Sequence, residues 1–597
     1  MNNFVIRTEE LEDSQLKELY VETENDNDIL NRLKSQSPVL LVGSRGMGKS
    51  FLFKISQMQL LENFQKDRIF PVFLTFRSAS LVQTGNNIQF ELWMLNKICT
   101  VIIRELKRQG LITGNKWNFG NIVGDECKNG NSIETLMEIN KQFENSWKNP
   151  GKMIDVSAVP TIDDLMEIIE DLCWDLNIKR FVIYIDEAAH IFIPEQQRQF
   201  FSIFREIRSA YVKCNAAVYP GVTCYGDTFE PMHDAVTINL TRDIREENYI
   251  DNMKEMVLKQ VEDSEMVKNM LQNGENFSVL AYAACGNPRL LLRSVEKAGN
   301  FKSNSVTNVF REFYREEIWS EQSSLAEKYP GNSEFVDWGR NFIESVVLPE
   351  IKSKNDKFLP LNKSTSAFFW IHRNSPQVVK ESLRILEYTG IIKLQATGIK
   401  ATNSEIGNRY EVNIGCLLAL ETLPLTNALN IIKKLSAKKM SEFGANSKAY
   451  DSLLKKVPQF TEPNMTECLK MQLTKSINVL EITEWQKGKL RELNINNLGE
   501  LLISKESDLM KAYQVGKVRS RQMKNAAFAA VFEYLFGQKY CYIYIADWFS
   551  EIKMRINRLF SCLFLYIAIP HKGVAIKFSG KGGRLICTNR VQKLNAK

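Results

Sequence analysis

The stretch LLVGSRGMGKSFLF, residues 40–53, decides how the N-terminal part of this chain is organised. Its first residues end an apolar run, PVLLV at 38–42, which has the length and composition of a short buried strand. Three glycines and then Lys49 and Ser50 follow, after which apolar residues resume as in a helix. This is the G-x-x-x-x-G-K-[ST] spacing of a phosphate-binding loop between a strand and a helix.

The chemistry of the loop follows from its residue types. Glycines allow the backbone dihedrals that turn successive N–H groups toward phosphate oxygens, and they leave no side chain in the way. The helix that begins near Lys49 adds its positive N-terminal end. We expect Lys49 to reach the β- and γ-phosphates of ATP and Ser50 to bind Mg²⁺. The residues expected to line the nucleotide are Gly43, Ser44, Arg45, Gly46, Met47, Gly48, Lys49, Ser50 and Phe51.

A phosphate loop predicts a second strand that ends in an acid, and FVIYIDEAAH at 181–190 supplies it. Asp186, at the end of the strand, is expected to hold Mg²⁺ through water, and Glu187 to polarise the attacking water. A surface acid pair after a core strand is the alternative explanation of this motif.

A third motif, ACGNPRLLLRSVEKAG at 284–299, predicts a capped helix. Asn287 is a good N-cap and Pro288 a good first helical residue. Arg289 then lies in the first turn, where a cation is unfavourable with the helix dipole. That penalty suggests a use for the arginine, such as contact with a γ-phosphate.

Together GSRGMGKS, FVIYIDE and GNPR resemble an AAA+ ATPase, most closely of the ORC-type (origin-recognition) branch and its bacterial relatives. The resemblance covers roughly residues 1–425 and implies ATP hydrolysis, with Arg289 as the sensor 2 arginine. It also implies a polar sensor 1 residue after a strand, for which Thr223 is the candidate and Asn215 a weaker one. A loop-capping hydroxyl is an equal alternative for Thr223.

Relatives of this type usually receive an arginine finger from a neighbouring subunit of an oligomer. The segment PGVTCYGDTFEPMHDA at 220–235 contains no arginine. Arg205 and Arg208, on the preceding helix, are substitutes, although solvated charges on an amphipathic helix explain them equally well. Activation in trans within a homo-oligomer is therefore an open alternative.

The predicted fold class is α/β, an AAA+ parallel sheet with a helical lid, a winged helix and a small all-α module. Further strands are expected at 70–76, 216–222 and 235–240, and their alternation with helices predicts a parallel sheet covered on both faces. The Gly- and Asn-rich stretch at 110–132 lacks periodicity and indicates a long loop inside an insertion at 109–160.

Residues 374–414 have the order helix, strand, polar loop, strand, which predicts the end of a winged helix. In the major groove of double-stranded DNA the helix would offer Gln377, Lys380 and Arg384, and the loop would offer Lys400 to phosphates. Winged helices also bind proteins, and acidic residues on this helix weaken the case for DNA.

The stretch at 479–535 predicts a second C-terminal module. Thr483 and Gln486 form a predicted capping box, and Gly516 stands in a tight turn before a long helix. The module resembles the helix-hairpin-helix group, which implies DNA phosphate binding by Lys517, Arg519, Arg521 and Lys524. A small helical bundle with a solvated basic edge is the alternative.

The predicted domains follow from these motifs. They are the ATPase core at 1–242, the lid at 243–325, the winged-helix domain at 326–430, a helical connector at 431–475, the hairpin module at 476–540 and a basic tail at 541–597.

Composition limits the classes of protein that fit. Of 597 residues 44% are hydrophobic and 25% charged, which is ordinary for a folded chain with full cores. The eleven cysteines form no C-x-x-C pair, and the acidic N-terminus has no apolar segment, so we expect a cytoplasmic protein without a membrane anchor. After Glu551 there are ten Lys and Arg and no acid, so the net charge of +7 arises in the tail.

The main hypothesis is an ATPase that couples its nucleotide state to DNA binding. The resemblance implies a mobile-element or phage-defence setting, with an effector protein as a further partner. The alternative is a signalling switch ATPase whose C-terminal modules bind proteins. A small-molecule kinase is disfavoured by the GNPR motif and the size of the C-terminal modules.

Overall fold

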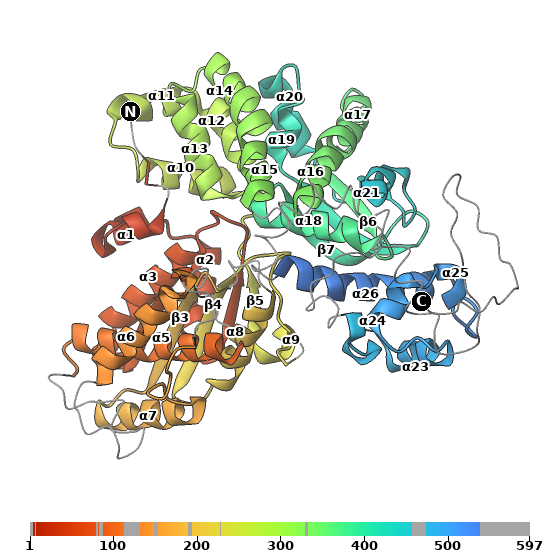
Figure 1. The fold of residues 1–597 in the computed structure, drawn as a ribbon. Coiled ribbons are helices and arrows are strands. Elements are labelled where there is room, and N and C mark those ends of the chain that lie inside the picture. The colour runs from red at the N-terminus through yellow and green to blue at the C-terminus, as the bar shows by residue number, and fades with distance from the viewer. Residues whose placement is uncertain are drawn as a thin grey trace, which may run out of the picture. The chain divides into compact units, whose positions relative to one another are not determined.

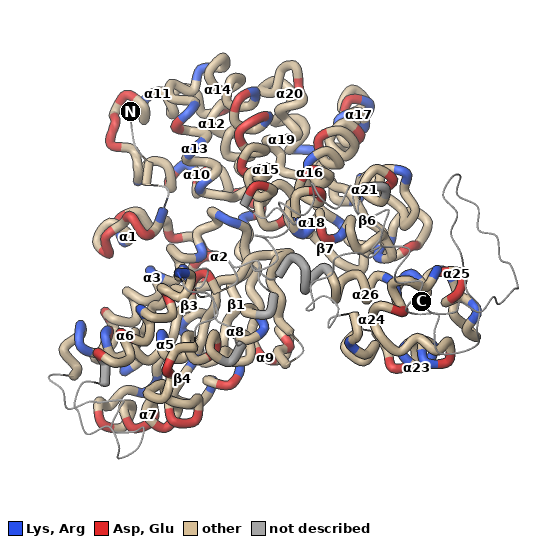
Figure 2. Tube along the Cα trace, viewed as in Figure 1, with Lys and Arg blue, Asp and Glu red and all other residues tan. Residues whose placement is uncertain are grey.

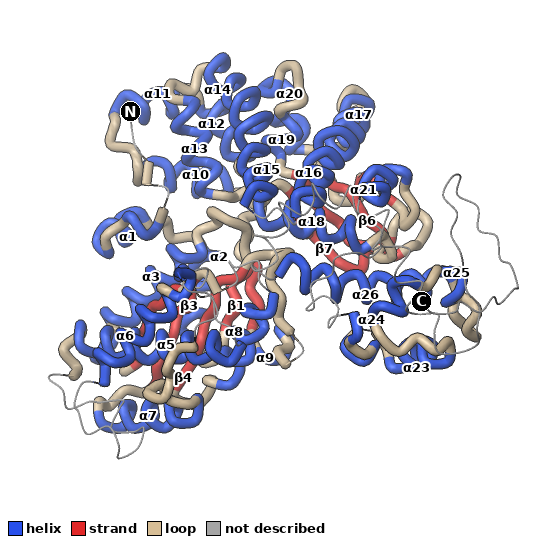
Figure 3. The backbone as a smooth tube through the Cα atoms, in the orientation of Figure 1, coloured by secondary structure: helices blue, strands red, loops and turns tan. Residues whose placement is uncertain are grey.

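The fold was analysed in a computed structural model of the chain. The structure describes residues 4–5, 7–78, 82, 87–112, 132–148, 153–188, 194–226, 228–328, 332–456, 473–480 and 482–537. The described chain divides into two compact units, one that runs to residue 456 and one that covers residues 473–531. Figure 1 shows their elements and Figure 3 the distribution of helices and strands.

The first unit begins with a five-stranded parallel sheet, in the order β2-β3-β4-β1-β5. The strands are β1 (Val39–Val42), β2 (Ile69–Thr75), β3 (Arg180–Asp186), β4 (Val212–Val218) and β5 (Val236–Asn239). The predicted α/β fold class is confirmed: the sheet is parallel, with helices on both faces. One predicted strand was placed wrongly: β4 ends at Val218, because Tyr219, Pro220 and the left-handed Gly221 turn the chain away.

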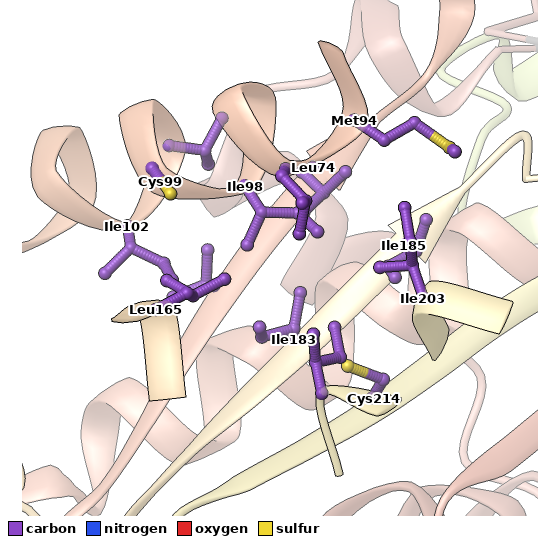
Figure 4. Packing of buried hydrophobic residues seen from close by; sticks show 14 of the residues in the cluster. Leu74, Met94, Ile98, Cys99, Ile102, Leu165, Ile183, Ile185, Ile203 and Cys214 are labelled. Carbon is purple, nitrogen blue, oxygen red and sulfur yellow. The ribbon is translucent and has the colours of Figure 1, made fainter. Parts of the chain in front are cut away.

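Alternate residues of the strands face opposite helical layers. Ile183 and Ile185 belong to the same hydrophobic cluster as residues of α5, α7 and α8, whereas Val182 and Tyr184 pack with α1, α2 and α3. Figure 4 shows the first layer, where Ile98 and Ile102 of α5 lie over the sheet. The helices of the core are α1 (Asp13–Leu19), α2 (Glu24–Lys34), α3 (Lys49–Glu62), α4 (Phe64–Asp67), α5 (Asn87–Arg108), α6 (Ser132–Glu144), α7 (Ile162–Asp175), α8 (Pro194–Glu206) and α9 (Pro231–Asp234).

The insertion predicted at 109–160 is not loop throughout. Its described part contains α6, whose Leu136, Ile139 and Phe143 are buried in the same cluster as α5. The glycine-rich residues 113–131 lie outside the described residues.

A helical region follows the sheet. Its elements are α10 (Tyr249–Leu258), α11 (Ser264–Gln272), α12 (Gly274–Ala283), α13 (Pro288–Ala298), α14 (Ser303–Val309), the π-helix η5 (Phe310–Glu317) and α15 (Ile318–Lys328). Helix α15 spans the predicted border at 325/326, so that border is not a linker between domains.

The region in which a winged helix is predicted has a four-stranded sheet in the order β7-β8-β6-β9. Its elements are α16 (Ser333–Phe342), η7 (Ile343–Val347), α17 (Leu348–Phe358), β6 (Phe368–His372), α18 (Gln377–Thr389), β7 (Ile392–Lys400), β8 (Ile406–Val412), α19 (Ile414–Leu418), α20 (Pro424–Lys433), β9 (Met440–Phe443) and α21 (Asp451–Lys456). The predicted helix and two strands are present as α18, β7 and β8, but β7 runs to Lys400, so this lysine ends a strand and does not lie in the loop as predicted.

The predicted helical connector at 431–475 is wrong at its start. Strand β9 pairs with β6, because the alternating MSEF buries Ser441 and Phe443 on one side and leaves Glu442 exposed. Residues 457–472 lie outside the described chain.

The second unit is helical in its described part. It contains α23 (Glu484–Glu492), α24 (Leu498–Ile503), α25 (Glu506–Leu509) and the start of α26 (Lys517–Gly537). The capping box of Thr483 and Gln486 is confirmed. The tail at 541–597 lies outside the described residues. In the part of the chain that the structure describes, no helix is long and apolar enough to span a membrane.

Candidate nucleotide site

The loop between β1 and α3 has the backbone that its glycines predict. Gly46 and Gly48 have φ values of 87° and 95°, in the left-handed region, and Gly48 is the N-cap of α3. A Cβ atom at Gly46 would lie 2.7 Å from the Cβ of Arg289, so the loop and the GNPR motif of α13 are in tight contact.

Lys49 is buried at the start of α3. Its Nζ donates to the carbonyls of Gly43 at 2.6 Å and Ser44 at 3.1 Å, and lies 3.9 Å from the ring centroid of Tyr219. Burial lowers the pKa of Lys49 to about 7, opposed by the attraction of Asp186.

Asp186 ends β3 near this lysine, and Glu187 follows directly after the strand. Burial raises the pKa of Asp186, whereas a hydrogen bond with Ser50 and the charge of Lys49 lower it. Asp186 Oδ1 accepts from the backbone N–H of Glu187 at 2.9 Å. The carboxylate and the Ser50 hydroxyl are hard oxygen ligands, the kind that Mg²⁺ prefers.

Glu187 has a strained backbone, with φ at 56°, in the region that side chains other than glycine rarely adopt. Its side chain lies 3.8 Å from Arg77 Nε and 3.5 Å from Thr75 Oγ1. Burial and then the charge of Asp186 raise its pKa, which moves the carboxylate toward the range of a general base.

The N-cap of α13 is confirmed. Asn287 Oδ1 accepts from the backbone of Arg289 and Leu290, and its Nδ2 donates to the carbonyl of Arg45 at 2.9 Å. Burial lowers the pKa of Arg289, and among the described residues its buried Nε has no hydrogen-bond partner. This N–H group lies next to the loop and can donate a hydrogen bond to a phosphate.

Arg242, which directly follows the last strands, was missed from the sequence. Its guanidinium donates to the carbonyl of Met47 at 3.0 Å and pairs with the buried Asp26 at 3.3 Å, and its NH1 lies 3.4 Å from the carbonyl of Gly286. It thus ties α2, the loop and the GNPR motif together. The position of Arg242 after a strand of a parallel sheet could have indicated its role, because the carboxyl ends of parallel strands lie at the same edge of the sheet.

The two sensor 1 candidates, Thr223 and Asn215, each donate a hydrogen bond to a backbone carbonyl. Thr223 Oγ1 donates to the carbonyl of Tyr219 at 2.6 Å, as a loop-capping hydroxyl would. Asn215 is buried in the middle of β4 and donates to the carbonyl of Leu33. From the segment after β4, Tyr219 contributes a side chain beside Lys49.

The two substitute arginines both contact the segment before β5. Arg205 donates to the carbonyl of Thr228 at 2.6 Å, and Arg208 to that of Asp234 at 3.0 Å. Their side chains are half exposed.

The predicted DNA-reading helix α18 makes contacts within the first unit. Gln377 donates to Glu381 at 2.6 Å, and Arg384 pairs with Glu381 and donates to the carbonyl of Gly221. Lys380 is partly buried on α18, whereas Lys400 is exposed at the end of β7. The side chain of Arg384 is therefore already bound to the loop after β4 of the α/β core.

Glu387 of α18 is buried, and its Oε1 accepts from the backbone of Leu394 at 3.0 Å. Burial raises its pKa to about 7, so between about pH 4.5 and 7 the folded chain keeps a proton that the unfolded chain has released. We therefore expect stability to fall as pH rises through that window, by up to about 1.4 kcal/mol per pH unit.

Glu387→Gln should remove that part of the pH dependence. The measurement is the midpoint of urea unfolding at pH 5 and pH 7 for both proteins. An equal pH effect in the variant would show that another group is responsible.

The four hairpin cations of the second unit differ in availability. Lys517 and Arg519 are exposed, and Arg519 lies 4.8 Å from the ring of Trp485. Arg521 pairs with Glu506 at 3.2 Å, and Lys524 donates to the carbonyls of Leu501 and Leu502. Figure 2 shows acidic positions among the basic ones along α23.

Comparison with known proteins gives one family match. Residues 4–80, which contain the glycine loop, match the family model described as ORC-CDC6-like. No curated protein matches the chain significantly.

Two solved structures from Aeropyrum pernix match over most of their length. One is an ORC1 protein in complex with DNA, with 13% identity, a TM-score of 0.29, and coverage of 68% of this chain and 91% of that one. The other is an ORC2 protein in ADPNP-ADP complexes, with 12% identity, a TM-score of 0.30, and coverage of 70% and 93%. The chain has a parallel α/β core, and its loop-bearing residues 4–80 are similar to the ORC-CDC6-like family.

Proposed function

We propose that the chain is an ATPase that binds ATP and Mg²⁺ at the β1–α3 loop and couples its nucleotide state to binding of double-stranded DNA. The observation that carries the proposal is the convergence of Lys49, Ser50, Asp186, Glu187 and Arg289 at one loop with two left-handed glycines.

Each residue has a defined role in this proposal. The loop N–H groups and Lys49 bind the phosphates, and Ser50 and Asp186 would hold Mg²⁺. The ion neutralises phosphate charge when it is bound. Glu187 positions and polarises the attacking water, and the unpaired Nε of Arg289 binds phosphate oxygen from the lid side.

Contacts of α13 with the loop suggest how the lid responds. Asn287 binds the carbonyl of Arg45, and Gly46 has no room for a side chain against Arg289. Occupation of the loop would therefore shift α13, and the change would pass to the winged-helix region.

DNA contact is assigned to Lys400 on the wing and to Lys517 and Arg519 of the second unit, because all three are exposed. Gln377, Lys380 and Arg384 would join them once α18 leaves Gly221. Arg521 and Lys524 contribute less, because Glu506 and two helix-end carbonyls already bind them. Assembly into an oligomer, an effector partner and a role in phage defence or a mobile element remain predictions of the resemblance.

Replacing Lys517 and Arg519 together with Ala should weaken duplex binding for every sequence tested. The slope of log affinity against log salt should shrink by about 0.9 for each lost phosphate contact, and ATP affinity should not change. The measurement is a salt titration of duplex binding by fluorescence anisotropy.

Lys511→Ala is the matched control, since Lys511 is an exposed cation of the same unit that pairs with Asp508. An unchanged slope in the double variant would favour the alternative function, a switch ATPase whose modules bind proteins. The ATPase rate with and without duplex DNA then separates the two functions.

A further inference from the structure

The ammonium of Lys49 is held by its own loop and by an aromatic ring. Two backbone carbonyls, those of Gly43 and Ser44, accept from it, and the ring of Tyr219 lies 3.9 Å away. A cation over a desolvated aromatic face is attracted by the ring quadrupole. To bind a phosphate, the ammonium must give up part of these contacts.

Tyr219 is itself fixed from the winged-helix side. Its ring packs edge-on against that of Tyr388 of α18, with centroids 5.2 Å apart and an interplanar angle of 70°. Its carbonyl accepts from Thr223, so the backbone of the loop after β4 is also held.

The contact between this loop and α18 is close. A Cβ atom at Gly221, which has a φ of 74°, would lie 2.6 Å from the carbonyl oxygen of Arg384. At the end of α18, a Cβ atom at Gly390 would lie 3.2 Å from the hydroxyl of Ser44, within the phosphate loop itself. Helix α18 therefore contacts both the loop that carries Tyr219 and the loop that carries Lys49.

We propose that Tyr219 is a positioning residue that holds the Lys49 ammonium against the carbonyls of Gly43 and Ser44, and that Tyr388 keeps its ring in that place. This inference rests on the proposed function and adds the regulation of its site. ATP binding draws Lys49 away from the ring, whereas docking of α18 keeps the ring under it. ATP binding and docking of α18 therefore oppose each other. By thermodynamic linkage, each lowers the equilibrium constant of the other by the same factor.

The test is the affinity of the full chain for ATP, measured by calorimetry in a set of variants. Tyr219→Leu removes the ring face and should tighten ATP binding about tenfold, in the range of a desolvated cation–π contact. Tyr219→Phe keeps the face and should bind ATP as the original chain does. Tyr388→Leu should tighten binding to a smaller extent.

Tyr225→Leu is the matched control. Tyr225 lies in the same segment and packs on Phe201 and Phe229, without a contact to Lys49, so its loss should leave ATP affinity unchanged. A merely structural role of Tyr219 would weaken binding in Tyr219→Leu and Tyr225→Leu alike.

The tighter ATP binding expected for Tyr219→Leu must also depend on Lys49. In a Lys49→Ala background, Tyr219→Leu should bring no tightening, because no ammonium remains to be released. Unchanged or weaker ATP binding by folded Tyr219→Leu overturns the proposal. If that variant does not fold, absence of tightening in Tyr388→Leu overturns it instead.

Failure of the proposed function gives a different result. There Lys49→Ala alone would bind ATP as tightly as the original chain. Loss of affinity in Lys49→Ala without a gain in Tyr219→Leu would leave the nucleotide site in place and remove only the positioning role.

Discussion

Replacing Glu187 with Gln is expected to slow ATP hydrolysis by ~10²-fold or more, while ATP still binds. The substitution keeps the size of the side chain and removes the carboxylate that polarises water. Glu187 lies beside Asp186, whose charge, together with burial, raises its pKa, so the carboxylate is suited to accept a proton. The measurement is the steady-state ATPase rate together with ATP affinity.

Glu9→Gln is the control for this prediction. Glu9 also contacts Arg77, at 3.5 Å, so its loss perturbs the same arginine without removing the acid after β3. Hydrolysis by Glu187→Gln at the original rate would exclude Glu187 as the catalytic base.

Loss of Lys49 should have the second-largest effect, a fall of tenfold or more in ATP affinity in Lys49→Ala. Each factor of ten corresponds to about 1.4 kcal/mol of binding free energy. The lysine is a cation next to the proposed phosphate position, and it is buried, so its charge acts in a low-dielectric environment. Calorimetric titration with ATP measures the change.

Two further variants make the result interpretable. Lys49→Met keeps most of the side-chain volume, so a fall in affinity there cannot be attributed to a cavity. Lys54→Ala removes another cation of α3, one that lies 4.1 Å from the ring of Phe73, and should leave ATP affinity unchanged. If both Lys49 variants bind ATP normally, the loop is not a phosphate site.

The sequence predicted the phosphate loop because its structure is determined locally. The left-handed backbone at Gly46 and Gly48 is predicted by the residue type, because glycine adopts it readily. The helix N-cap at Asn287 is likewise predicted by the residue type. The alternation of strands and helices likewise predicted the α/β class.

The parts that sequence reasoning missed depend on partners far along the chain. Arg242 contacts Asp26 and Met47, and the residues next to Arg242 in the sequence do not predict either contact. The hairpin cations looked alike in sequence, yet Glu506 occupies Arg521 and the end of α24 occupies Lys524. Tyr219 was assigned to a strand interior, and only the end of β4 at Val218 places it next to Lys49.

The central place of β1 in the sheet also governs when the phosphate loop can form. Val39 pairs with Asn215 on one side and with Val236 on the other, both far later in the chain. At about 5–20 residues per second, the ribosome reaches β5 on the order of ten seconds or more after β1. Until then β1 lacks at least one of its two neighbours, and such non-local pairing is slow to assemble. ATP bound at the proposed site would therefore stabilise only the finished sheet, by mass action on the folded chain, and would not guide its early folding.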